Sequence, residues 1–235
     1  PVGFFSGFDE DGRAGDLYWF EINQELTPDP ASRFQPRGVE GPSQVIDPRS
    51  YAWQSGEWRR PVLRGRVIYE LHIGTFTPEG TFARAMARLG ELADLGVNTI
   101  ELMPLGDFPG RFNWGYDGVM IHAPARCYGG PDELRALIDA AHARGLAVIV
   151  DVVYNHLGPC GNVLPRFSDD YFHPRHSTGW GSGLNFDGPN SEPVRQFFLQ
   201  NACLWVDEYR VDGLRLDAVH AIHDESASHL IAEVA

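Results

Sequence analysis

The feature that most constrains this chain is a repeated alternation of short apolar runs with stretches of helical periodicity, which begins at residue 67. Four strands are expected, at residues 67–73, 97–103, 146–153 and 213–218. Helical patterns follow them at residues 81–95, 131–144, 191–209 and 224–235. Because the strands are nearly continuous apolar runs, they predict a parallel sheet covered by helices. A doubly wound sheet and a (β/α)8 barrel both satisfy this pattern.

The first 60 residues follow a different pattern. They contain one convincing strand, at residues 16–22, followed by a Pro-rich run and further loop residues. Because one strand cannot form a stable domain, we interpret residues 1–60 as the C-terminal remnant of a β-sandwich domain plus a linker. Residues 61–235 then form the second domain.

The charge balance excludes several classes of partner. The chain has 19 basic and 32 acidic residues, a net charge of −13, and its basic residues form no cluster that could follow a phosphate backbone. We therefore expect neither nucleic acid nor a membrane as a partner. The sequence has no long apolar run and no signal-peptide pattern, which favours a cytoplasmic protein.

The cysteines indicate no covalent or metal framework. Cys127, Cys160 and Cys203 are odd in number, widely spaced and outside any C-x-x-C pair. They predict neither a disulfide network nor a zinc site, and we expect no metal and no cofactor.

Polar and aromatic side chains concentrate just past the carboxyl ends of the expected strands. They are Trp114, Tyr116 and Asp117 after the second strand, Asp151, Asn155 and His156 at the third, and Arg215 and Asp217 on the fourth. Barrel enzymes assemble their active sites at this edge, but open α/β sheets also bind ligands there. The placement therefore indicates a site more strongly than it indicates a barrel.

Charged residues on the strands need partners. Arg215 and Asp217 are two apart, so they share one face of their strand. A guanidinium next to a carboxylate lowers the carboxyl pKa by roughly 1 to 3 units, which keeps a nucleophile ionised, although a structural ion pair has the same spacing. Asp151 is a lone acid in an apolar run, and Arg215 is its expected partner. Glu70 and His72 fit a polar barrel interior or a structural pair equally well.

Several side chains in the loops could contact a sugar. Asn155 and His156 lie at a strand mouth and could donate to hydroxyl groups, although a loop histidine is more often simply solvated. Trp114, Tyr116 and Trp180 offer flat apolar faces that could stack on a sugar ring. Such aromatics are also common in cores, so stacking and packing both remain open.

Two of these segments resemble signature regions of a known family. The runs DVVYNH at 151–156 and GLRLDA at 213–218 are similar to two signature regions of glycoside hydrolase family 13, the α-amylase family. The resemblance extends over residues 61–235. It implies a (β/α)8 TIM barrel, of which this chain holds the first half, about four βα units, after the tail of an N-terminal β-sandwich domain.

The resemblance also implies a retaining mechanism and a role for each matching residue. Asp217 is the nucleophile that attacks the anomeric carbon, and Asp151 is the structural aspartate. Arg215, His156 and Tyr116 match the residues around the sugar that is cleaved. Trp114, Asn155, His220 and Asp117 complete the expected substrate-binding set.

The general acid is expected to lie outside this chain. In the family, a glutamic acid at the end of the next strand protonates the leaving oxygen, and a further aspartate lies two strands beyond. Glu233 is the only candidate substitute within the chain. We expect it to lie off the apolar stripe of its helix and to face solvent, so it is not the acid.

Within the family, two longer runs narrow the expected activity. Residues 68–82 and 217–222 most resemble members that cleave the α-1,4 bond next to a terminal trehalose unit, whose substrate is a malto-oligosaccharide with a trehalose end. Branching enzymes, which transfer the glucan to another sugar, are the alternative. A non-catalytic glucan-binding relative is a third reading, against which the intact Arg215 and Asp217 argue.

Overall fold

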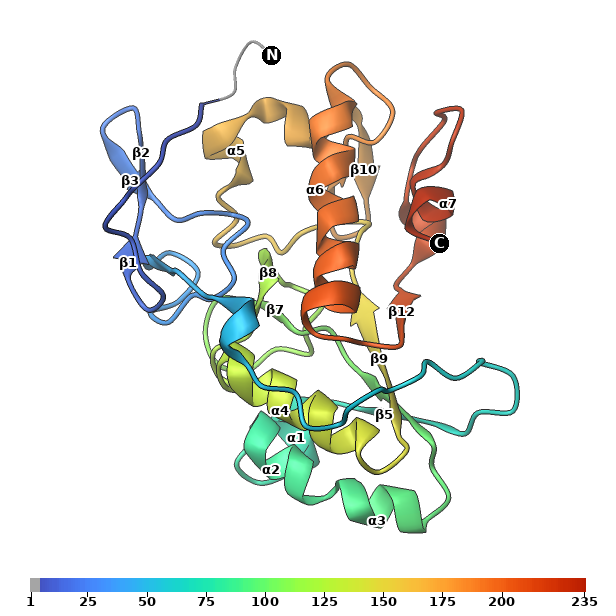
Figure 1. The fold of residues 1–235 in the computed structure, drawn as a ribbon. Coiled ribbons are helices and arrows are strands. Elements are labelled where there is room, and N and C mark those ends of the chain that lie inside the picture. The colour runs from blue at the N-terminus through green and yellow to red at the C-terminus, as the bar shows by residue number, and fades with distance from the viewer. Residues whose placement is uncertain (1–4) are drawn as a thin grey trace.

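A parallel sheet of four strands forms the centre of the molecule (Figure 1). The computed structural model describes residues 5–235, so residues 1–4 of the first predicted domain lie outside the described residues. The strands are β5 (Ile68–Leu71), β6 (Thr99–Leu102), β9 (Ala147–Val152) and β12 (Gly213–Leu216). All three pairings between them are parallel, as the apolar runs predicted.

The order of these strands distinguishes between the two architectures that the sequence left open. The sheet order is β12-β9-β6-β5. Each strand of this sheet therefore lies beside the strand of the same sheet that comes before it in the sequence. A doubly wound sheet reverses its strand order at a switch point, whereas a barrel adds strands in one direction. Across the described strands, the sheet follows the barrel order.

Helices and irregular segments connect the strands. The α-helices are α1 (Ile73–Phe76), α2 (Phe82–Ala87), α3 (Leu89–Asp94), α4 (Pro131–His142), α5 (Leu164–Phe167), α6 (Ser191–Cys203) and α7 (Leu230–Val234). Short 3-10 turns lie at η1 (Pro48–Ser50), η2 (Asp169–Tyr171) and η4 (Val219–Ala221), and η3 (Leu204–Glu208) is π-helical. No helix of the described residues is long and apolar enough to cross a membrane.

Three of the expected helices differ from their predicted bounds. The 81–95 helix breaks at Arg88, whose backbone N–H caps α2 by bonding to Ala85 and Met86, with the weak helix former Gly90 just beyond. The 191–209 helix is regular only to residue 203 and ends in a π-helical turn. The helix expected from residue 224 begins at Leu230, because the residues before it form a loop.

The N-terminal segment contains more strands than the single one expected. Residues 16–22 divide into β1 (Leu17–Tyr18) and β2 (Phe20–Ile22), and β2 pairs with β3 (Glu25–Thr27). The turn between β2 and β3 uses positive φ angles of 53° at Asn23 and 68° at Gln24, as a two-residue hairpin turn requires. β1 pairs with β4 (Ser43–Gln44).

The linker between the two predicted domains is fixed to the sheet. The indole Nε1 of Trp58 donates to Asp212 Oδ1 at 2.7 Å, and its ring stacks on His142 of α4 with centroids 4.4 Å apart. The other oxygen of Asp212 accepts a hydrogen bond from Val148 N of β9 at 2.8 Å. The same aspartate therefore holds the linker and the start of β12.

Two small antiparallel pairs that the sequence did not predict lie in the loops. β7 (Gly106–Asp107) pairs with β8 (Met120–Pro124), and β10 (Phe172–Thr178) pairs with β11 (Gly181–Leu184). The second pair, the 172–184 hairpin, follows β9 and lies beside α6 (Figure 1).

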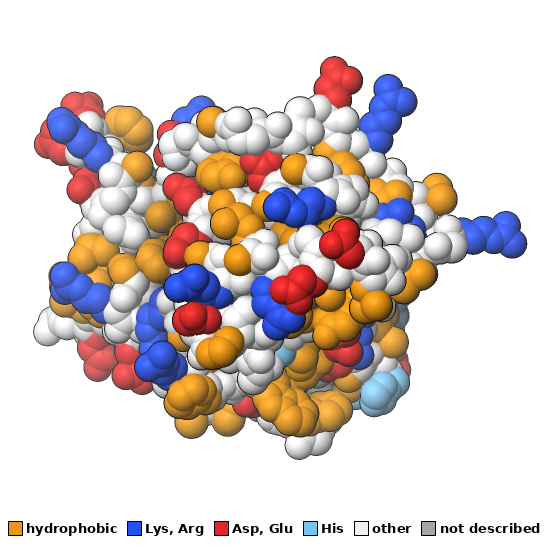
Figure 2. Space-filling model, turned by 90° about the horizontal axis from the view of Figure 1, so that it is seen from below, with side chains coloured by type: hydrophobic (Ala, Val, Ile, Leu, Met, Phe, Trp, Pro, Cys, Tyr) orange, Lys and Arg blue, Asp and Glu red, His pale blue; other side chains and the backbone are white. Residues whose placement is uncertain are grey.

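The edge strand β5 is poorly covered. Val67, Ile68 and Tyr69 keep 54%, 43% and 38% of their surfaces exposed, whereas Ile100 and Val148 of the inner strands are fully buried. On the face drawn in Figure 2, basic side chains are interspersed with acidic and apolar ones and form no continuous basic surface.

Candidate active site

Two aspartates share the guanidinium of Arg215 at the carboxyl edge of the sheet. Parallel pairing places Arg215 of β12 opposite Asp151 of β9. Arg215 Nη1 donates to Asp151 Oδ2 at 2.9 Å and to Asp217 Oδ1 at 2.6 Å. The predicted partnership of Asp151 and Arg215 is therefore confirmed, and the adjacent carboxylate of Asp217 joins it.

The partners of Asp151 leave one of its oxygens free. Tyr116 OH also donates to Asp151 Oδ2, at 3.0 Å, whereas the buried Oδ1 has no hydrogen-bond partner among the described residues. Burial raises the pKa of Asp151 to about 6, although the hydrogen bonds from Arg215 and Tyr116 oppose this rise. Burial lowers the pKa of Arg215, but its bonds to Asp217 and Asp151 outweigh this effect and raise it, so the guanidinium stays charged.

Asn155 and His156 are occupied by protein partners. The Asn155 amide donates to the backbone oxygen of Asp217 at 3.0 Å, and its side-chain oxygen contacts His156 Nδ1. His156 Nε2 bonds to the backbone oxygen of Tyr116 at 2.9 Å. Burial lowers the pKa of His156, against the opposing effects of Tyr116, Asp117 and Asp217. In place of the expected free donors, these two side chains hold the backbone on either side of the site.

The aromatic residues differ in what they contact. The Trp180 ring, at the tip of the 172–184 hairpin, stacks on His156 with centroids 5.4 Å apart and remains 52% exposed. Trp114 is 74% exposed. Neither tryptophan is a core residue, so the packing alternative that the sequence left open does not apply to them.

The remaining predicted residues lie in two exposed loops. Asp117 accepts a hydrogen bond from Asn113 Nδ2 at 2.8 Å, and Asn113 Oδ1 accepts one from Gly115 N, so this contact shapes the loop. His220 is exposed in η4, three residues after Asp217. Between them Ala218 has a left-handed φ of 41°, a strained conformation for alanine that turns the chain sharply at the site. The sequence contained no indication of this turn.

Glu101 is a polar residue of the site that sequence reasoning missed. The carboxylate oxygens of Glu70, Glu101 and Asp151 lie within 4.8 Å of one another, on three neighbouring strands. Burial raises the pKa of Glu101, and Glu70 adds to the rise. His72 bonds instead to Asn113 O at 2.8 Å and Tyr128 OH at 2.9 Å, so it forms no pair with Glu70. The structural pair is therefore wrong, and the polar barrel interior stays a prediction, because Glu70 is exposed among the described residues.

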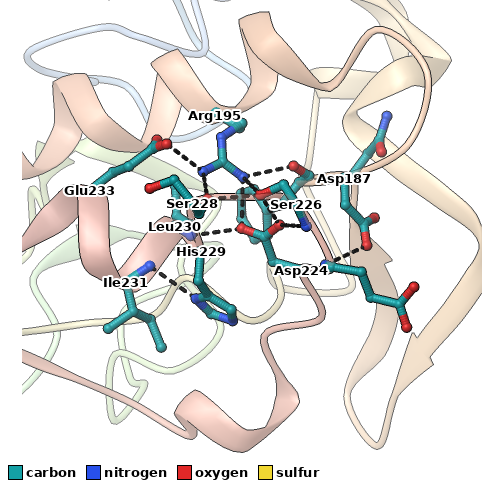
Figure 3. A network of polar contacts seen from close by, with 12 residues as sticks. Asp187, Arg195, Asp224, Ser226, Ser228, His229, Leu230, Ile231 and Glu233 are labelled. Atoms are coloured by element: carbon teal, nitrogen blue, oxygen red, sulfur yellow. Dashed lines mark hydrogen bonds and ion pairs between the residues drawn. The ribbon is translucent and has the colours of Figure 1, made fainter.

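Glu233 has a structural partner. It is exposed, as predicted, and it also forms an ion pair with Arg195 Nη2 at 2.9 Å (Figure 3). Arg195 also binds Asp224 Oδ2 at 2.7 Å. Asp224 accepts from the backbone of Ser226 and Leu230, which holds residues 224–229 in a loop and delays the start of α7.

The sheet order and the paired aspartates at the carboxyl edge fit a domain of the β/α-barrel class. The family model described as "Alpha amylase, catalytic domain" matches residues 46–179 of the chain. The chain therefore belongs to the α-amylase family, as its two motifs predicted.

Individual relatives give a finer comparison. The chain is 54% identical over 216 residues to the malto-oligosyltrehalose trehalohydrolase of Rhizobium sp. (strain M-11), covering 92% of this chain and 36% of that protein. It is 33% identical to the 1,4-alpha-glucan branching enzyme of Pseudoalteromonas atlantica, covering 88% of this chain and 32% of that enzyme. The chain thus spans about a third of the length of these relatives.

Solved structures agree on the fold. A crystal structure described as an alpha amylase from Salmonella typhimurium has a TM-score of 0.92 and 46% identity, covering 95% of this chain and 38% of its own. A pullulanase from Anoxybacillus sp. LM18-11, complexed with maltotetraose, has a TM-score of 0.75 and 26% identity, covering 88% of this chain and 36% of its own.

Proposed function

We propose that this chain belongs to the catalytic barrel of a retaining α-glucan hydrolase that releases trehalose from maltooligosyl trehalose. The observation that carries the proposal is the Asp217 carboxylate, held by Arg215 at 2.6 Å at the carboxyl edge of the sheet. The Asn155 amide supports the backbone of the same aspartate. A fixed carboxylate beside a permanent cation suits a nucleophile that must stay ionised.

In the proposed reaction, Asp217 attacks the anomeric carbon while the glycosidic bond breaks and a general acid protonates the departing oxygen. Water then hydrolyses the glycosyl ester and regenerates the carboxylate. Arg215 stays beside Asp217 as the charge of this carboxylate is lost and regained. Asp151 holds the guanidinium in place, and Tyr116, which is proposed to border the sugar, donates to Asp151. Trp114, His156, Asp117 and His220 are proposed to line the sugar subsites.

The general acid is proposed to lie outside residues 1–235. Glu233 is a poor candidate because Arg195 holds it. The four strands would be the first half of an eight-stranded barrel. β5 lies at one end of the sheet, and its exposed apolar side chains support a further element packed against it. We also propose that residues 1–60 end a β-sandwich domain. The unpaired Cys127, Cys160 and Cys203 support a cytoplasmic location.

The trehalose end of the substrate is inferred from relatives. Malto-oligosyltrehalose trehalohydrolases are 45 to 54% identical to this chain over the aligned residues, which are 36% of the length of the two relatives at the ends of that range. The branching enzyme, at 33% identity, is the specific observation that favours transglycosylation as the second candidate. Both reactions use the same nucleophile, so the acceptor distinguishes them.

The test uses the full-length protein and a purified malto-oligosaccharide that carries a terminal trehalose. The hydrolase proposal expects free trehalose and a shortened malto-oligosaccharide, measured by chromatography. New α-1,6 branches in amylose without free trehalose would support the transferase. An Asp217→Asn variant as active as the parent would exclude the proposed nucleophile in either case.

A further inference from the structure

A cluster of histidines lies on the 172–184 hairpin, outside the set of residues assigned to the sugar. The side-chain ligand atoms of His173, His176 and Asp187 all lie within 4.8 Å of one another. The ring centroids of His173 and His176 are 3.9 Å apart, and the His223 ring stacks on His176 with centroids 4.8 Å apart. The cluster opens into a surface cavity of about 600 Å³.

The polar atoms of this cluster are incompletely paired. Asp187 Oδ2 accepts a hydrogen bond from Glu225 N at 2.9 Å, but the buried Oδ1 has no hydrogen-bond partner among the described residues. That free oxygen lies 3.9 Å from His173 Nε2, too far for a direct hydrogen bond. A buried carboxylate oxygen without a donor is costly unless another group, such as a cation, reaches it.

The burial of His173 suits a metal ligand. Its side chain is only 4% exposed, so it is held in place by the surrounding protein. A neutral imidazole offers a ring-nitrogen lone pair for coordination. The backbone N–H of Arg175 donates a long hydrogen bond of 3.2 Å to His173 Nδ1. Coordination of a metal through Nε2 requires the tautomer that carries its proton on Nδ1, and this hydrogen bond would then be lost.

We propose that His173, His176 and Asp187 form a binding site for a divalent transition metal ion, best matched by Zn²⁺. Two imidazoles and one carboxylate are a ligand set that zinc accepts, whereas magnesium and calcium prefer oxygen ligands. Tetrahedral zinc ligands lie about 3.3 Å apart, so modest rotations of the two rings would close the set. His223 or a water molecule completes the coordination.

Such an ion would join the hairpin to the segment before α6 and, where His223 completes the coordination, to the segment after η4. His173 and His176 belong to β10, Asp187 precedes α6, and His223 follows η4. The tip of the same hairpin carries Trp180, which stacks on His156. The ion therefore acts as a structural clamp that positions Trp180 beside the proposed sugar subsite.

The test measures metal binding by the full-length protein after removal of metals with a chelator. Isothermal titration with ZnCl2 should give one site, and Co²⁺ should give the visible absorption of a tetrahedral complex. His176→Gln and Asp187→Asn should each weaken zinc binding at least about tenfold and abolish the cobalt absorption. Arg175→Gln, an exposed hairpin residue between the two histidines, is the matched control and should bind zinc at least as tightly as the parent.

Circular dichroism establishes that each variant is folded, and Asp187→Asn keeps the size of the side chain and an acceptor for Glu225 N. Zinc should also raise the thermal unfolding midpoint of the parent but not that of Asp187→Asn. Absence of saturable zinc binding would overturn the proposal. Equal binding by the parent, His176→Gln and Asp187→Asn would also overturn it, because it would identify an adventitious ion only.

Discussion

Arg195 and Arg215 each bridge two carboxylates, but their surroundings are opposite. The Arg195 side chain is 6% exposed and Arg215 is 42% exposed. Beyond its two carboxylates, Arg195 donates to the backbone oxygen of Phe186 at 2.8 Å. It also donates to the backbone oxygen of Ser228 at 2.7 Å (Figure 3). Arg215 has only Asp151 and Asp217 as acceptors among the described residues.

The pKa values of the carboxylates also differ between the two networks. Burial would raise the pKa of Asp224, but hydrogen bonds from Ser226 and Arg195 outweigh it and hold the pKa at about 2. Burial raises the pKa of Asp151 to about 6 despite Arg215. A saturated network stabilises the loop that it closes, whereas an unsaturated and accessible one can still interact with a substrate.

The sharpest test of this contrast is the substitution Asp217→Asn. Without the proposed nucleophile, the full-length protein should lose activity by about 10⁴-fold to 10⁶-fold, because the covalent route would be closed. Its urea unfolding midpoint should stay close to that of the parent. Asp94→Asn, in the exposed end of α3, is the control and should keep full activity.

Removing the two arginines should produce effects of different kinds. Arg195→Ala leaves the buried Asp224 without its cation and should lower the free energy of unfolding by about 3 to 5 kcal/mol, measured by urea denaturation. Arg215→Ala should cost less stability, since its side chain is half exposed, but should lower kcat by at least about 100-fold. A larger loss of unfolding free energy in Arg215→Ala than in Arg195→Ala would contradict this contrast between the two arginines.

The networks should also respond to pH with opposite signs. Asp224 has its ordinary pKa of 3.8 lowered to about 2, so its stabilising contribution is complete above about pH 4 and is lost as the pH falls toward 2. Asp151 has its pKa raised to about 6, so its ionisation costs stability as the pH rises from about 4 to 6.

Urea midpoints measured across this pH range would test the signs. Asp224→Asn should flatten the acid limb of the parent curve, and Asp151→Asn should flatten the loss between pH 4 and 6. If the curves of both variants run parallel to the parent curve, Asp224 and Asp151 are not the groups that cause the pH dependence.

The smallest expected effect comes from Tyr116→Phe. It removes one hydrogen bond to Asp151 Oδ2 and should lower the free energy of unfolding by about 0.5 to 1.5 kcal/mol, measured by urea denaturation. The pKa of Asp151 should rise further, because this hydrogen bond lowers it. Tyr51→Phe, which loses a long 3.3 Å bond to Asp139 far from the site, is the matched control for kcat.

Much of the sheet and the centre of the site could be predicted from the sequence. Strands such as 146–153 are short apolar runs between helical patterns, a local property that tertiary contacts did not override. The Asp151–Arg215 pair followed because a lone acid in such a strand must find a cation. The strand order could not be derived from these runs, since it depends on which strands pair.

Other elements depend on contacts that have no local pattern. The 172–184 hairpin is rich in His, Gly and Ser, so neither strand alternates clearly between polar and apolar residues. Residues 224–229 have helical spacing, but the Asp224 carboxylate takes up backbone N–H groups in a loop. The left-handed Ala218 and the clustering of Glu101 with Asp151 are set by tertiary structure.

The uncovered edge of β5 has a consequence for handling the molecule. An exposed strand with apolar side chains on it, such as Ile68 and Tyr69, is a template for pairing with another chain. A preparation of these 235 residues is therefore expected to be prone to aggregation. Truncation sites for crystallisation or expression are best chosen so that this edge stays paired.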